Sequence, residues 1–165
     1  MKQLNLLEIE TRWGYKTFEL YQGDITGLEF PVDVLAVSAF YGSYAPVPNT
    51  VIRALRDNCG VEVGELARRP EFNLKEGFNC WVARLPGDAK FRRLLCVEFT
   101  GGEEPREVIE NLFVTLSVLD MKGVKVGTLA LPILGTGNQV LSPEKVIKAL
   151  LDSSLSYMNR SQNLR

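Results

Sequence analysis

The chain of 165 residues contains no histidine. This absence excludes catalysis by a Ser-His-Asp or Cys-His arrangement, metal sites with histidine ligands, and a histidine general base. An enzyme built on these residues has to use carboxylates, lysine, tyrosine, cysteine or groups of its own ligand.

Cysteine is also scarce. The chain has three cysteines, Cys59, Cys80 and Cys96, and no Cys-x-x-Cys pair. An odd number of isolated cysteines is typical of reduced thiols in a cytoplasmic protein and argues against a disulfide framework or a zinc site. We therefore expect three small buried apolar residues, a cytoplasmic location, no metal and no cofactor.

Excess positive charge and long apolar runs are absent as well. The formal net charge is −1, which argues against a nucleic-acid partner. No run of about 18 apolar residues occurs, and Met1-Lys2-Gln3-Leu4-Asn5 lacks a signal-peptide core, so we expect no membrane contact. With 45% hydrophobic residues, 1–165 is expected to form a single domain, either alone or within a longer protein.

Apolar runs alternate with helical patterns along the chain. Val32 to Ala39 predicts a strand buried on both faces, and apolar residues recur with helical spacing between Pro105 and Met121. Strands that alternate with such helices indicate an α/β fold with a largely parallel sheet covered on both sides. The expected strands are 4–12 and 17–22 (a hairpin), 32–39, 80–85, 94–99 and 126–131; helices are expected after Thr50, from Pro105 and after Ser142, and 60–77 is expected to be irregular.

Two glycine loops follow strand-like runs: Gly23-Asp24-Ile25-Thr26 and the segment from Leu131 to Gly137. Open α/β sheets build their ligand crevice at such strand ends. Glycine lets backbone N–H groups approach and cradle a phosphate, while a carboxylate such as Asp24 accepts a hydrogen bond from an exocyclic amine. The pair of loops therefore favours a nucleotide ligand.

Taken in order, these segments resemble the macro domain family. The resemblance rests on Gly23-Asp24-Ile25-Thr26, on Val32 to Val37, and on Leu131-Pro132-x-x-Gly135-Thr136-Gly137 followed by Ser142-Pro143. It implies a three-layer α/β/α sandwich with a mixed sheet and an ADP-ribose-like ligand. By resemblance, Asp24 accepts from the adenine amine, the Ile25 N–H reaches an adenine ring nitrogen, and residues 135–137 wrap the diphosphate.

The chain also departs from the family. Many macro-domain hydrolases carry Asn-Ala-Ala-Asn after the strand that corresponds to residues 32–37, whereas this chain reads Val37-Ser38-Ala39-Phe40 and lacks the following glycine run. A phenylalanine cannot position a water or bond a ribose hydroxyl. The aromatic group formed by Phe40, Tyr41 and Tyr44 is either packing and a stiff lid, or a platform for a ligand ring. The expected ligand-binding residues are Asp24, Ile25, Val37, Ser38, Phe40, Tyr41, Leu134, Gly135, Thr136, Gly137, Asn138 and Val140.

These departures favour a non-catalytic module that binds or senses ADP-ribose or a nucleotide derived from it. One alternative is an ADP-ribosyl hydrolase with a displaced catalytic group such as Asp33 or Glu98, and another is a ligand-free interaction domain. A sensor without catalytic residues also implies an attached or separate effector, or a homo-oligomer. A bulky residue at Gly135 or Gly137 is expected to block the ligand without unfolding the protein.

The last expectation concerns the chain after the final helix. Macro-type sheets usually receive another strand there, but Ser161-Gln162-Asn163-Leu164-Arg165 is too polar for a buried strand. We therefore expect either an open sheet edge that needs a cover or a longer protein.

Overall fold

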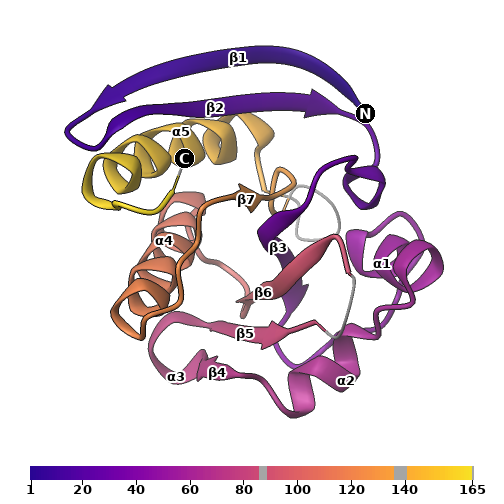
Figure 1. Ribbon diagram of the computed structural model, residues 1–165. Helices are drawn as coiled ribbons and strands as arrows, with labels where there is room; N and C mark the ends of the chain where they lie inside the picture. The colour runs from indigo at the N-terminus through magenta and orange to yellow at the C-terminus, as the bar shows by residue number, and fades with distance from the viewer. Residues whose placement is uncertain (86–88, 136–140, 165) are drawn as a thin grey trace.

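A computed structural model describes residues 1–85, 89–135 and 141–164. Its main sheet has five strands in the order β4-β5-β6-β3-β7 (Figure 1). The central strand β3 (Val32–Phe40) pairs in parallel with β6 (Phe91–Phe99) and β7 (Leu129–Ala130). The outer strands β5 (Cys80–Arg84) and β4 (Phe72–Leu74) pair antiparallel, so the sheet is mixed, with a parallel centre.

Strand β3 is buried on both faces because its sequence is a nearly continuous apolar run. Val34 and Ala36 point into one core cluster, and Leu35 and Val37 point into the other. The alternation follows from the two-residue period of a strand. The prediction of a doubly buried central strand is confirmed.

Helices cover both faces and complete a three-layer α/β/α sandwich (Figure 1). Helices α4 (Pro105–Met121) and α5 (Pro143–Arg160) pack on the face of the first cluster, and α1 (Val51–Cys59) and α2 (Val63–Arg68) pack on the other. The apolar stripe predicted for α4 is buried as expected. Its members are Val108, Ile109, Leu112, Phe113 and Leu116.

Helix α1 also begins where the sequence predicts, directly after Thr50. The Thr50 hydroxyl accepts a hydrogen bond from the Arg53 amide at 3.2 Å, which caps the helix at the predicted residue. Ser142 precedes α5 at the predicted N-cap position, but its side chain makes no capping hydrogen bond. Pro143 and Glu144 open that helix as expected.

The first two strands, β1 (Lys2–Thr11) and β2 (Gly14–Gln22), form a sheet of their own. This hairpin, called the ribbon below, lies over α5 (Figure 1). Ile9 and Phe18 pack against the main core, and the buried Lys16 ammonium donates to the Ser161 carbonyl. The ribbon is therefore attached to the domain mainly through residues near its turn, on the face that lies over α5.

Two predicted segments differ from the structure. Residues 60–77 are not irregular but contain α2, β4 and α3 (Lys75–Phe78). Helix α2 forms because Val63, Leu66 and Ala67 have helical spacing and pack on the core, a signal of only three residues. Of the strand predicted for 126–131, only Leu129–Ala130 forms a ladder with β3, because the amides of Gly127 and Thr128 donate to the Asp33 carboxylate instead.

After α5, the chain turns back against α4. The Asp120 carboxylate accepts from Tyr157 Oη at 2.8 Å and from Asn163 Nδ2 at 3.3 Å, and Leu164 is buried. Between Ser161 and Leu164, the residues described after this helix, no strand forms. None of the described helices is long and apolar enough to cross a membrane.

Candidate functional site

The C-terminal end of β3 brings two of the predicted site segments together. Ser38 Oγ accepts a long hydrogen bond, 3.4 Å, from the Gly135 amide that follows β7. At the end of the strand, Phe40 and Tyr41 are 45% and 60% exposed, and the Tyr41 amide donates to the Phe99 carbonyl of β6 at 2.9 Å. The ends of three neighbouring parallel segments thus carry a hydroxyl, a glycine amide and two exposed rings.

Gly135 has a structural reason to be glycine. Its φ is +71°, and a Cβ there would lie 2.6 Å from Leu141 Cδ1 and 2.9 Å from Phe99 Cζ. Its carbonyl accepts from the Leu141 amide at 2.9 Å, which ties together the two ends of the intervening loop. A substitution at Gly135 therefore strains the fold itself, contrary to the expectation that only ligand binding would suffer.

The rest of that loop falls on undescribed residues. Thr136, Gly137, Asn138 and Val140, four of the predicted ligand-binding residues, lie outside the described ranges. Their proposed roles rest on sequence alone. The structure fixes where their loop begins and ends, beside Ser38 and Phe99.

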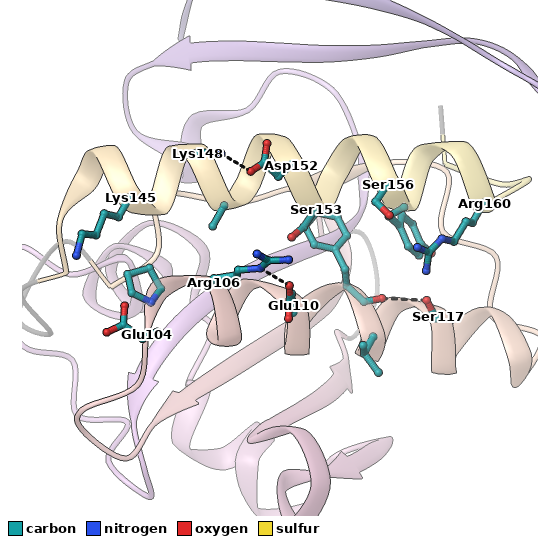
Figure 2. A pocket seen from close by; sticks show the side chains of 15 residues that line it. Glu104, Arg106, Glu110, Ser117, Lys145, Lys148, Asp152, Ser153, Ser156 and Arg160 are labelled. Atoms are coloured by element: carbon teal, nitrogen blue, oxygen red, sulfur yellow. Dashed lines mark hydrogen bonds and ion pairs between the residues drawn. The ribbon is translucent and has the colours of Figure 1, made fainter.

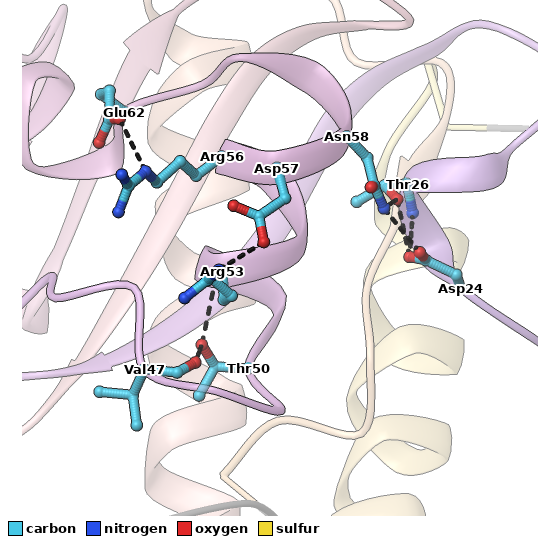
Figure 3. A network of polar contacts seen from close by, with 9 residues as sticks. All are labelled: Asp24, Thr26, Val47, Thr50, Arg53, Arg56, Asp57, Asn58 and Glu62. Carbon is cyan, nitrogen blue, oxygen red and sulfur yellow. Dashed lines mark hydrogen bonds and ion pairs between the residues drawn. The ribbon is translucent and has the colours of Figure 1, made fainter.

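Asp24 forms the second group of predicted site residues (Figure 3). It is the N-cap of the short 3-10 helix η1 (Ile25–Gly27), and its Oδ1 accepts from the Thr26 amide at 2.9 Å and the Thr26 hydroxyl at 2.8 Å. Its Oδ2 accepts from Asn58 Nδ2 of α1 at 3.0 Å. Asp24 is exposed and Ile25 is half-buried. Within the described ranges, no hydrogen bond joins this group to Ser38 or Gly135.

Two predicted residues have side chains inside the core. Val37 is fully buried in the cluster under α1 and α2, and Leu134 is buried in the cluster under α4 and α5. Only the backbone of these two residues is left to contact a ligand. Their side chains instead hold the strand and the loop in place.

A buried polar cluster lies at the C-terminal end of β6. The Glu98 side chain is fully buried and pairs with the Lys75 ammonium at 2.9 Å from Oε1, which also accepts from Trp81 Nε1 at 3.1 Å. The Tyr44 hydroxyl donates to the same oxygen and accepts from Lys75 at 2.6 Å. Glu98 Oε2 is buried with no hydrogen-bond partner in the described part of the chain.

Burial and the Glu98 hydrogen bond raise the pKa of Tyr44. Burial acts to lower the pKa of Lys75, but its hydrogen bonds to Tyr44 and Glu98 outweigh burial and raise that pKa. Near neutral pH, Lys75 is therefore an ammonium and Tyr44 a neutral phenol. It could not be found from the sequence, because its members come from four separate segments.

The two displaced catalytic groups considered from sequence are both engaged elsewhere. Asp33 lies at the opposite end of β3 from Phe40, where its Oδ2 accepts from the amides of Gly127 at 2.8 Å and Thr128 at 3.1 Å. Glu98 is enclosed by the cluster just described. Neither carboxylate is exposed beside Phe40.

The cysteines differ from each other. Cys80 and Cys96 are buried as expected, and burial raises the pKa of Cys80 to about 12. The expectation of burial is wrong for Cys59, which is exposed at the last position of α1. Desolvation raises the pKa of Cys59, and nearby Asp24 adds to the rise. In the described residues, no group of His, Cys, Asp and Glu side chains has the arrangement of a metal site.

A hollow of about 390 Å³ is lined by Gly42, Tyr44, Glu62, Arg68 and neighbours, next to the loop that follows β3. A larger one of about 610 Å³ lies between α4 and α5 (Figure 2). Paired charges line it, including Arg106 with Glu110 and Lys148 with Asp152. None of the predicted site residues that the structure describes lines the larger hollow, so its size does not mark the predicted site.

No protein-family model and no curated protein matches the chain. Solved structures do. A macrodomain mutant from Oceanobacillus iheyensis superimposes with a TM-score of 0.71 at 13% identity, over 99% of this chain and 84% of that one. The macrodomain of Mycobacterium tuberculosis DarG gives a TM-score of 0.60 at 14% identity, over 87% and 91%. The chain has a macrodomain fold. The family resemblance predicted from three short segments is thus confirmed at the level of the fold.

A further match is a macrodomain solved with a nucleotide. The Oceanobacillus iheyensis macrodomain with ADP superimposes with a TM-score of 0.69 at 14% identity, over 97% of this chain and 85% of that one. In open α/β folds, ligands bind outside the carboxyl ends of the parallel strands. In this chain those ends carry Ser38, Phe40 and Gly135.

Proposed function

We propose that this chain binds ADP-ribose or a nucleotide derived from it, and that it senses this ligand without hydrolysing it. The observation that carries the proposal is the Ser38–Gly135 contact, which sets a glycine loop at the end of β3 in a macrodomain fold. A solved macrodomain with ADP supports the ligand class. The backbone of residues 135–137 binds the diphosphate, with the Thr136 hydroxyl beside it.

Asp24 takes the adenine amine in this proposal. A carboxylate offers about four acceptor positions, and the three hydrogen bonds from Thr26 and Asn58 leave capacity on an exposed group. The half-buried Ile25 presents its backbone amide next to this carboxylate.

The exposed rings of Phe40 and Tyr41 support a stacking platform at the far end of the ligand. Phe40 stands where a hydrolase of this fold would need a group that holds water. Asp33 and Glu98 are both occupied away from this point. We therefore propose binding without turnover, in the cytoplasm, with an attached or separate effector that reads the bound state.

Calorimetry of the full chain against ADP-ribose, NAD, cyclic ADP-ribose derivatives and AMP tests the proposal. We expect saturable binding of at least one ADP-ribose derivative and no release of ADP-ribose from modified protein. Absence of binding across the panel would remove the nucleotide function. Turnover that disappears in a single-residue variant would make the chain a hydrolase.

A further inference from the structure

The ribbon leaves one strand edge without a partner. Strand β1 contacts α5 through one face and pairs with β2 along one edge, and its other edge lies on the side away from the main sheet (Figure 1). The Leu6 amide donates to the side chain of its neighbour Asn5 at 2.8 Å. No strand pairs with this edge in the part of the chain that the structure describes.

The same strand exposes apolar side chains. Leu4, Leu6 and Leu7 are 51%, 43% and 47% exposed, in a ten-residue strand without proline. A long apolar edge strand is a template for pairing with another chain. A two-stranded hairpin is also marginal by itself, and needs further strands or a helix to be stable. The ribbon is held by Ile9 and Phe18, which pack against the main core, and by Lys16, which bonds the Ser161 carbonyl just after α5.

The charges on β1 determine which partner fits. Its first residue is Lys2, and the acidic residues Glu8 and Glu10 lie at its other end. When two copies pair antiparallel, the basic end of each strand meets the acidic end of the other, and the leucines meet in the middle. A parallel pairing would instead set like charges side by side, which is destabilising.

We propose that two copies of this chain associate through β1, antiparallel and centred near Leu6, and that the two ribbons form one four-stranded sheet. Such a contact is two-fold symmetric, because each copy contributes the same strand. The Asn5 side chain releases the Leu6 amide, which then bonds the second copy. The contact is formed by β1 alone, which contributes none of the residues of the proposed nucleotide site.

Sedimentation equilibrium of the full chain over a range of concentrations tests the contact. We expect a monomer–dimer equilibrium, weakened by about tenfold or more in Leu6→Lys because two lysines then face each other across the axis. The matched control is Val114→Lys, an exposed site of similar apolar character on α4. A wild-type chain that is monomeric at every concentration would overturn the proposal.

Charge-reversal variants distinguish an antiparallel β1–β1 contact from a dimer formed through another surface. Lys2→Glu makes every charge on β1 acidic, and Glu8→Lys combined with Glu10→Lys makes every charge basic. We expect each variant alone to dimerise weakly and an equimolar mixture to recover the heterodimer. Because both variants must be folded to recover it, a recovered heterodimer excludes misfolding. Dimers that are indifferent to these changes would place the contact elsewhere and overturn the proposal.

Discussion

Asp24 combines a structural and a proposed recognition role in one side chain. It caps η1 and holds Asn58 of α1, and its exposed carboxylate retains acceptor capacity. We expect Asp24→Ala to weaken binding of an adenine ligand by about 1–3 kcal/mol, because the amine loses a charged acceptor. Calorimetry measures the loss.

The control is Asn58→Ala, which removes the link to α1 but keeps the carboxylate. This variant should lose stability while it retains most of its affinity. Equal affinity in wild type and Asp24→Ala would take Asp24 out of the binding site.

A substitution at Gly135 tests the packing around this residue, next to the proposed phosphate-binding loop. We expect Gly135→Ala to lower the free energy of unfolding by about 1–3 kcal/mol, because a positive φ is strained for alanine and its Cβ meets Leu141 and Phe99. Urea denaturation measures this. Gly77→Ala is the matched control, since its φ is ordinary and nothing lies within 4 Å of the added Cβ. A Gly135→Ala variant as stable as Gly77→Ala would contradict the packing argument.

At the scale of elements, the Lys75–Glu98 pair links α3 to β6. Removal of one partner leaves a buried charge, which costs about 3–5 kcal/mol when both partners are fully buried. The Lys75 side chain is 24% exposed, so we expect Lys75→Met to lower the free energy of unfolding by about 2–3 kcal/mol. Lys148→Met, in an exposed pair on α5, should cost less than about 0.5 kcal/mol. Similar costs for the two variants would show that Glu98 is not held by Lys75.

The same cluster predicts a pH dependence. Lys75 and Tyr44 both have a higher pKa in the folded protein than their ordinary values of 10.5 and 10.0. The folded state therefore binds these protons more tightly, so their contribution is complete below about pH 10 and is lost as the pH rises through the folded values.

Urea denaturation of wild type and Lys75→Met at several alkaline pH values isolates this contribution. The stability difference between the two proteins should shrink as the pH rises. Groups such as Lys16, whose pKa burial lowers, change both proteins alike and cancel in the difference. A difference that stays constant with pH would contradict the assignment.

Across the whole molecule, short sequence patterns predicted the helices and strands that neighbouring residues determine. The apolar run of β3 and the helical stripe of α4 are strong signals because each contains at least five apolar residues in one pattern. Helix α2 was missed because only Val63, Leu66 and Ala67 signal it. The Asn58 partner of Asp24 is 34 positions away and the Tyr44 partner of Glu98 is 54 positions away, so no spacing rule connects them.

The ribbon is the part of the molecule that we expect to open most readily. Apart from Ile9, Lys16 and Phe18, it makes little contact with the core, whereas β3 is buried between two layers. Amides of β1 and β2 should therefore exchange with solvent faster than those of β3 at concentrations where the chain is monomeric. Hydrogen exchange measured by NMR gives both rates in one experiment.

Lys16 attaches the ribbon to the end of α5. Its ammonium donates to the Ser161 carbonyl, while its stem is buried beneath the ribbon. Lys16→Met keeps the apolar stem and removes a hydrogen bond from a charged group, worth about 1.5–3 kcal/mol, so exchange in the ribbon should speed up by about tenfold or more while β3 is unchanged. Lys148→Met removes an exposed lysine and should change neither rate. Equal acceleration in β3 and the ribbon would mean that the two open together, and that Lys16 stabilises the whole domain rather than the attachment of its first two strands.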